Sequence, residues 1–135
     1  MKVISPSARI MSELELMTIA QRIEQCGRLC YKSEDKITSE SAVKFVDDVI
    51  KRGHNSVLEM AVLTIDVMAP SSMINDFYML LPKYLVIDWL MPEHLLITGS
   101  VRAFREIARY VPQSMLVAGI SQYMHGVYPD LFDDP

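Results

Sequence analysis

The chain has 135 residues, of which 50% are hydrophobic and 22% are charged, and its formal net charge is −4. This length and composition predict a single globular domain, residues 1–135, with a sizeable core. The acidic balance argues against nucleic acid as a partner, and no apolar run approaches the roughly 20 residues of a membrane span. Because residues 1–6 lack the apolar core of a signal peptide, a cytoplasmic location is expected.

The N-terminal part predicts a short strand and a long helix. Residues 2–4 are apolar enough for a strand, which the following Ser-Pro pair would end. A helix is expected over residues 13–31, because apolar residues recur there at helical spacing. Cys26 and Cys30 lie four residues apart on one face of this helix, where buried thiols are commoner than a disulfide or a metal site.

A charged loop over residues 32–36 separates this helix from a second one. Thr38 or Ser39 is expected to cap the second helix. Its apolar residues recur at helical spacing and predict a buried side, with charged residues facing water. The residues expected on the buried side are Val43, Val46, Val49 and Ile50.

The most informative stretch follows the second helix and reads Gly-His-Asn-Ser-Val-Leu-Glu at residues 53–59. Gly53 is expected to end the helix as a left-handed cap. Ser56 and Glu59 match a capping box, in which each side chain binds a backbone amide at a helix start. His54 would then lie beside exposed amides, where an anion can bind. On local chemistry alone, a structural helix–turn–helix joint explains all of these residues.

The rest of the chain alternates strands and helices. Residues 62–68 alternate apolar and polar side chains, as a half-buried strand does. Residues 84–91 and 94–98 predict an apolar hairpin around Pro92-Glu93. Helices are expected from 71 to about 81 and from about 113 to 124, and between them Gly99-Ser100 introduces a helix that Pro112 breaks or restarts. An acidic tail is expected at 130–135. The fold class is therefore α+β, with a small, mostly antiparallel sheet packed with helices.

Few residues combine into a chemical motif. The three histidines lie far apart with no metal-ligand spacing to cysteine or acidic residues, so no metal site is predicted. The glycines are scattered singly, which excludes a glycine-rich phosphate loop. Arg102, Arg105 and Arg109 are three and four residues apart and share one helix face. Such charges are usually solvated, and phosphate binding by their planar guanidinium groups is the alternative.

Four stretches in the same order resemble the flavin-dependent thymidylate synthases, a family also called the thymidylate synthase complementing proteins. The first is Gly-Arg-Leu-Cys-Tyr at residues 27–31, and the second is the Gly-His-x-Ser-x-x-Glu joint at 53–59, followed by an alternating strand that ends in Ala-Pro. The third is Ile-Thr-Gly-Ser-Val-Arg-Ala-Phe at residues 97–104. The fourth is a last helix followed by Tyr-Pro-Asp-Leu-Phe at residues 128–132. The resemblance implies a fold like that of the family.

The chain departs from the family pattern at its main signature. The Arg-His-Arg positions of that signature fall on Met79, Leu80 and Leu81, and the segment from Pro82 to about residue 91 has no Ser, Asn or Arg. The long middle region of the family is missing, Met60 follows Glu59 where histidine is usual, and Ser100 replaces an asparagine. Losing cationic groups removes charge-assisted contacts worth roughly 1.5–3 kcal/mol each. The family's full reaction is therefore not expected.

The resemblance implies a cofactor, partners and site residues. Members are homotetramers that bind FAD at subunit interfaces and methylate deoxyuridine monophosphate, with methylenetetrahydrofolate as carbon donor and NADPH as hydride source. His54, Ser56 and Arg102 match flavin-contacting positions, and Cys30 matches a small polar position near the flavin. Glu59 belongs to the same group, although a capping box would explain it fully. Arg105 is a candidate for substrate binding, and no residue is assigned a catalytic role.

Three functional hypotheses remain open. In the first, a divergent homologue keeps a pocket for FAD or a nucleotide at a subunit interface. In the second, a non-catalytic homo-oligomer, a tetramer by resemblance, keeps only the scaffold; the ten methionines and the apolar stretch 84–97 fit a buried interface as well as a core. In the third, an active synthase has a rearranged site.

Overall fold

A three-stranded antiparallel sheet forms the centre of the computed structural model, which describes residues 6–111 and 113–132. The strands are β1 (Val62–Met68), β2 (Val86–Met91) and β3 (His94–Ser100), in the order β1-β3-β2. The alternation predicted for 62–68 and the hairpin around Pro92-Glu93 are both confirmed. The strand expected at residues 2–4 lies outside the described residues. So do residue 112 and residues 133–135 of the predicted tail.

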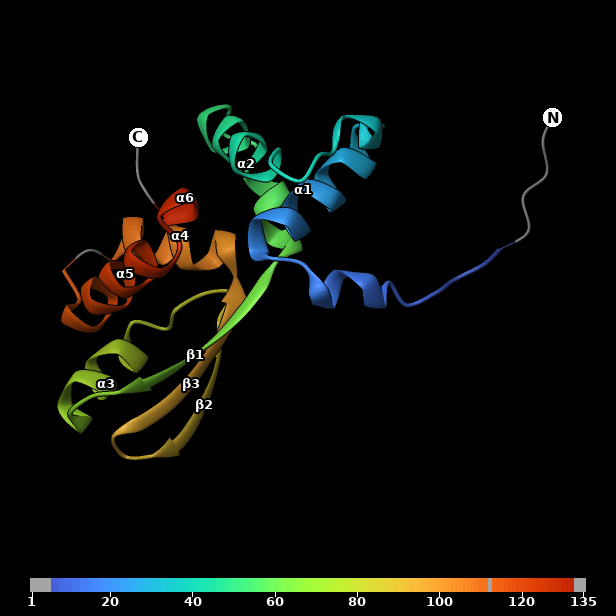
Figure 1. Ribbon diagram of the computed structural model, residues 1–135. Coiled ribbons are helices and arrows are strands. Elements are labelled where there is room, and N and C mark those ends of the chain that lie inside the picture. Colours follow the sequence, from blue (N-terminus) through green and yellow to red (C-terminus); the bar gives the residue numbers. More distant parts are fainter. Residues whose placement is uncertain (1–5, 112, 133–135) are drawn as a thin grey trace.

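Three helices cover one face of this sheet (Figure 1): α3 (Ser71–Met79), α4 (Val101–Tyr110) and α5 (Met115–Val127). The inward residues of the strands are apolar at every second position, so they pack together with the apolar stripes of the helices. Ser100 ends β3 and caps α4, because its hydroxyl accepts a hydrogen bond from the amide of Ala103. The fully buried members of this cluster are Ile74, Phe77, Leu95, Ile97, Val117 and Met124.

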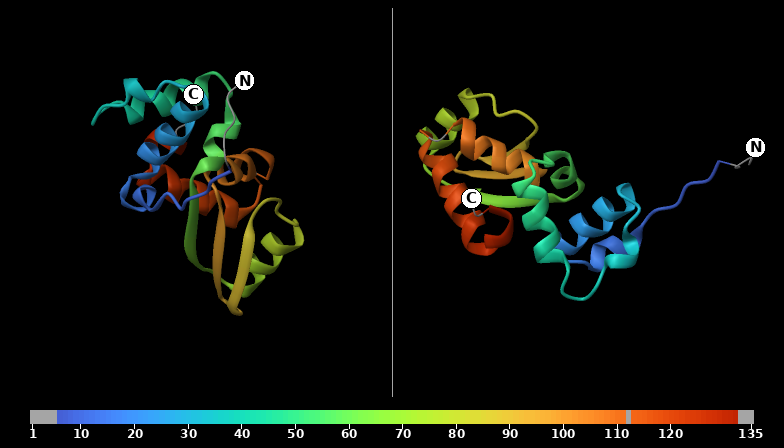
Figure 2. Two further views of the ribbon diagram at one scale, coloured as in Figure 1. Left: turned by 90° about the vertical axis from the view of Figure 1, so that its right-hand side faces the viewer. Right: turned by 90° about the horizontal axis from the view of Figure 1, so that it is seen from above.

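A second group of helices lies beyond the end of the sheet (Figure 2), and a second apolar cluster packs between them. It is formed by α1 (Ile19–Cys30), α2 (Ala42–Lys51), the 3-10 turn η3 (Asn55–Met60) and α6 (Pro129–Phe132). Residues 130–132, expected to begin an acidic tail, are helical instead. Leu131 is buried in the cluster, and this burial holds α6 against the molecule. The buried members of the cluster include Ile23, Val46, Val49 and Leu58. The α+β fold class is confirmed.

The long first helix is two elements rather than one. A 3-10 turn, η1 (Ser12–Leu16), precedes α1, and Met17 between them is extended. Thr18 starts α1 with a capping box: its hydroxyl accepts from the amide of Gln21, and the Gln21 side chain accepts from the amide of Thr18. The apolar periodicity continues through this break, so periodicity alone predicted one helix over residues 13–31, and that prediction was wrong.

The second helix begins later than expected. Neither Thr38 nor Ser39 caps it, because α2 starts at Ala42 after a 3-10 turn, η2 (Glu34–Lys36), and a short loop. The Ser41 hydroxyl accepts from the amide of Thr38 and donates to the buried Glu24, so it holds the loop instead of capping the helix. Val43, expected on the buried side, is exposed.

The paired cysteines are not both buried. Cys30 is exposed at the last position of α1, and Cys26 is only partly buried. Burial raises the pKa of the Cys26 thiol. The expectation of buried thiols failed because Glu24 and Gly27, rather than the cysteines, occupy the buried positions of this helix.

Two glycines in helices provide a matched test of the packing. A Cβ at Gly27 would lie 2.6 Å from Phe45 Cζ and 2.9 Å from Val57 Cγ1, whereas a Cβ at Gly119 would meet nothing within 4 Å. We expect Gly27→Ala to lower the free energy of unfolding by about 1–3 kcal/mol through overpacking. Gly119→Ala should raise it by up to about 1 kcal/mol through helix propensity. Urea unfolding curves measure both, and equal shifts would contradict this packing.

Candidate functional site

The joint after α2 is built by a left-handed glycine. Gly53 has φ +70°, its amide donates to the Ile50 carbonyl at 3.1 Å, and the amide of His54 donates to the Val49 carbonyl at 3.1 Å. These two bonds form the Schellman motif, in which a positive φ lets the chain reverse over the last helical turn. The expectation of a left-handed cap at Gly53 is confirmed. The motif places His54 directly beside the end of α2.

The predicted capping box after this glycine does not form. Residues 55–60 form the 3-10 turn η3, for which no side chain caps the start. Glu59 binds Arg102 instead of the amide of Ser56, with Arg102 Nη1 2.8 Å from Glu59 Oε1. A charged partner 43 residues away in the chain displaces the local hydrogen bond that the motif predicted. Ser56 is exposed in η3.

His54 finds a partner at the end of α1. Its Nδ1 lies 3.0 Å from the hydroxyl of Tyr31, and the two ring centroids are 6.1 Å apart. When the imidazole proton is on Nε2, Nδ1 accepts the hydrogen bond that the tyrosine hydroxyl donates. Cys30 precedes Tyr31 in the chain, so this contact brings the Gly-Arg-Leu-Cys-Tyr stretch to the Gly-His joint.

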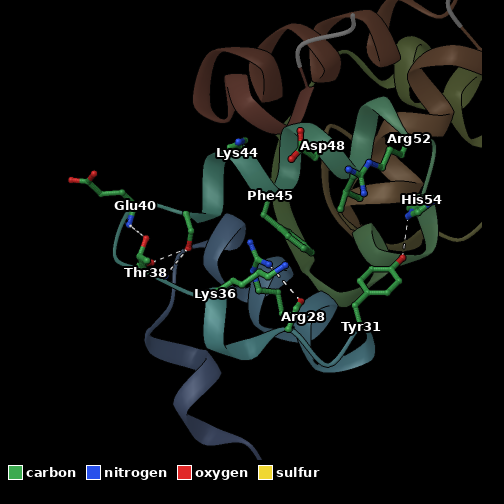
Figure 3. Close-up of a pocket in the computed structure, with 13 residues that line it drawn as sticks. Arg28, Tyr31, Lys36, Thr38, Glu40, Lys44, Phe45, Asp48, Arg52 and His54 are labelled. Atoms are coloured by element: carbon green, nitrogen blue, oxygen red, sulfur yellow. Dashed lines mark hydrogen bonds between the residues drawn. The ribbon is translucent and has the colours of Figure 1, made fainter.

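A cavity of about 670 Å³ opens beside this pair, between α1, η2 and α2 (Figure 3). Its volume lies within the range of roughly 300–1,000 Å³ that is usual for small-molecule sites. Basic side chains from all three elements line it, together with two carboxylates, Glu40 and Asp48. The cationic lining residues are Arg28, Lys36, Lys44 and Arg52. The cavity therefore has an excess of positive charge in a molecule whose net charge is negative.

Arg28 is held in the wall of the cavity by a buried carboxylate. Its Nε donates to Glu24 Oε2 at 2.9 Å, and its guanidinium lies 4.8 Å from the centre of the Phe45 ring. Glu24 is only 1% exposed, and its other oxygen accepts from the Ser41 hydroxyl at 2.9 Å. A buried carboxylate needs such a complete set of partners. Glu24 thus fixes the position of Arg28 and offsets part of its charge.

Arg102 lies in a second, smaller cavity of about 390 Å³. Besides Glu59, it binds Glu106, with Nε 2.8 Å from Glu106 Oε1. The hydrogen bond to Glu106, and then the one to Glu59, raises the pKa of the Arg102 guanidinium. Two carboxylates surround one guanidinium here, so this cavity is less suited to a phosphate than the larger one.

The predicted site residues therefore fall into separate places. His54 and the neighbour of Cys30 meet at the larger cavity, and Glu59 and Arg102 meet at the smaller one. Arg105 donates to the carbonyl of Leu131 in α6. Within residues 6–111 and 113–132, no three His, Cys, Asp or Glu side chains gather as metal ligands would. None of the helices in these ranges is long and apolar enough to cross a membrane.

The cations of the larger cavity were not among the predicted site residues. Lys36, Lys44 and Arg52 are ordinary surface residues of a loop and a helix in the sequence, and only the packing of α2 against α1 gathers them. One signal was available: Glu24 and Arg28 are four residues apart in a helix, a spacing at which opposite charges pair. It did not show that the pair is buried.

The fold and this cavity define an α+β protein with a cation-lined cavity next to a Gly-His joint. Residues 14–78, just under half of the chain, match the family model of the thymidylate synthase complementing proteins, and this match supports the resemblance seen in the sequence. The matched segment holds α1, α2, His54 and the whole lining of the larger cavity. It ends at Tyr78, one residue before the positions where the resemblance places the Arg-His-Arg signature. No curated protein matches the chain.

Proposed function

We propose that the chain is a divergent homologue of the thymidylate synthase complementing proteins that binds an anionic flavin or nucleotide in the cavity between α1 and α2. FAD is the ligand that the family resemblance favours. The observation that carries the proposal is that four cationic side chains line a cavity of ligand size, beside His54. Phosphate groups pair with guanidinium and ammonium groups, and helix and loop cations from three elements can contact more than one phosphate oxygen.

The lining fits the anionic part of FAD. Arg28 is fixed by Glu24, whereas Figure 3 shows Arg52 extending from the end of α2 on the same side of the cavity as His54. Phe45 and Tyr31 add aromatic surface to the lining, which suits a flat ring. When bound, a flavin supplies redox chemistry, and the chain's residues would bind and orient it.

The family's full reaction is not part of the proposal. The three signature positions carry Met79, Leu80 and Leu81, all exposed and none able to bind a phosphate. Arg102, the cation expected from the second signature, is paired with two carboxylates. A synthase that methylates a nucleotide needs these cationic contacts, each worth roughly 1.5–3 kcal/mol. The protein would therefore bind without completing the synthesis.

Removing one cavity cation should weaken binding. We expect Arg52→Ala to raise the dissociation constant for FAD by about tenfold to a hundredfold, because one charge-assisted contact contributes roughly 1.5–3 kcal/mol. The matched control is Arg109→Ala, which removes an exposed arginine of α4 that lies outside the cavity. Quenching of FAD fluorescence on titration with the purified protein gives both constants, and raised salt should weaken binding to the wild type.

His54→Ala tests whether the joint belongs to the site. It should abolish flavin binding, whereas a purely structural histidine would change only the unfolding curve. If the purified protein is colourless and does not quench the fluorescence of added FAD, FMN or ADP analogues, the binding proposal is refuted. The second hypothesis, a scaffold without a ligand, is then favoured. Arg102 already pairs with two carboxylates, Glu59 and Glu106, and this observation favours the scaffold hypothesis. Tritium release dependent on deoxyuridine monophosphate would instead show an active synthase with a rearranged site.

A further inference from the structure

The segment from α3 to the end of β2 exposes an unusual amount of apolar surface. Over residues 78–91, only Lys83 and Asp88 are charged. Nine large apolar side chains of this segment are exposed, by 42–79% of their surface. They are Tyr78, Met79, Leu80, Leu81, Tyr84, Val86, Trp89, Leu90 and Met91, and we call them the β2 face. Exposed apolar patches of this kind mark sites of association.

The β2 face surrounds an open edge of the sheet. Since the strand order is β1-β3-β2, the described part of the chain pairs β2 on one side only (Figures 1 and 2). Tyr78 and Trp89, whose ring centroids are 5.4 Å apart, join the end of α3 to this strand. Natural edge strands are usually protected by lysine, proline or a strong bulge. Here a register shift occurs between Trp89 and Met91, while Val86–Asp88 pair regularly with β3.

The size of the β2 face matches that of a stable interface. Nine large side chains exposed to this extent present on the order of 800 Å² of apolar surface, which is what each partner of a standard protein–protein interface buries. Tyrosine, tryptophan and methionine, all present here, are enriched in such interfaces. The area is thus sufficient for a specific complex.

The charges of the β2 face favour a second copy of the chain over a membrane. One lysine and one aspartate leave the face neutral, so two copies meet without net repulsion. An anionic membrane would need a cluster of basic residues next to the apolar surface. The face has one lysine, and the whole chain has a net charge of −4. A strand edge can also pair with its own copy around a twofold axis, which closes the assembly.

We propose that two copies associate through their β2 faces, with the two β2 strands antiparallel. The backbone groups on the open side of each strand then bond to the other copy, and the three-stranded sheets join into one six-stranded sheet. The flanking apolar side chains become buried on both sides of the new strand pair. This contact does not depend on a ligand in the cavity, and it would form one interface of any larger homo-oligomer.

Two valines at opposite edges of the sheet test the contact. Val86 in β2 is 62% exposed and Val62 in β1 is 56% exposed, and both flank β3 on the same face of the sheet, opposite Thr98 and Ser100 respectively. Val86→Glu places a second carboxylate two residues from Asp88, so four carboxylates would gather across the twofold axis. Like charges at an interface cost several kcal/mol, and we expect the dimer dissociation constant to rise by about 100-fold. Val62→Glu should leave it unchanged.

Sedimentation velocity of the unliganded protein over a concentration series measures this constant. Trp89, the only tryptophan, supplies a second readout: its emission should shift to the red when the wild type is diluted, but not in Val86→Glu. A tetramer that Val86→Glu divides into dimers supports the same contact. A wild type that stays monomeric, a dimer that Val62→Glu breaks equally, or a monomer that binds phosphatidylserine vesicles through this face would overturn the proposal. None of these outcomes involves FAD binding.

Discussion

Replacing Glu24 with alanine is expected to lower the free energy of unfolding by about 3 kcal/mol, the cost typical of breaking a buried ion pair. The side chains of Glu24 and Arg28 are 2% and 15% exposed, so water reaches the pair poorly. The substitution would leave the guanidinium of Arg28 without its carboxylate and the Ser41 hydroxyl without one of its acceptors. Urea unfolding followed by circular dichroism measures the change.

An exposed pair with the same spacing is the control. Asp47 and Lys51 also lie four residues apart in a helix, 2.7 Å from each other, but more than half of each side chain is exposed. Asp47→Ala should therefore change stability by less than about 0.5 kcal/mol. If the two substitutions had equal effects, the burial of the Glu24–Arg28 pair would contribute nothing to stability, which would contradict this prediction.

Phe77→Ala is expected to be as damaging, with a loss of about 3–5 kcal/mol. Phe77 is completely buried, and it packs α3 against the inner face of the sheet. Truncating it removes apolar contacts and leaves a cavity that the surrounding residues cannot fully close. Chemical denaturation gives the change in the free energy of unfolding.

Asn75 on the same helix provides the comparison for Phe77. It is exposed, so Asn75→Ala removes no core contact and should alter stability by no more than about 0.5 kcal/mol. A small effect of Phe77→Ala would mean that α3 does not depend on this core, and the assignment of the cluster between α3, α5 and the sheet would then be wrong.

Elements with strong periodicity could be predicted from the sequence. The alternation in β1 and the apolar stripe of α4 each follow from one repeat, because a single buried face dictates them. Element starts were less predictable. The first helix begins only after Thr18, which caps it, although the apolar repeat starts earlier in the sequence. Ser41 donates to Glu24 instead of capping α2. Both depend on which of several hydroxyl groups finds a partner, and periodicity carries no information about that choice.

The candidate site was predictable only where its geometry is local. Gly53 and His54 could be singled out because a left-handed cap depends on a few adjacent residues. The contact of His54 with Tyr31 spans 23 residues, and the pairing of Glu59 with Arg102 spans 43. Such contacts follow from how the helices pack. The local capping box predicted for Glu59 was wrong because helix packing brings Arg102 to Glu59.

The order of the strands also determines whether the N-terminal part of the chain can fold without the C-terminal part. The segment that matches the family model, residues 14–78, contains β1, but β1 pairs only with β3, at residues 94–100, within the described part of the chain. A fragment cut after residue 78 would keep the larger cavity yet leave every backbone group of β1 without a neighbouring strand. The segment that matches the family model is therefore not an independent folding unit, and its cation-lined cavity depends on the rest of the chain to complete the sheet.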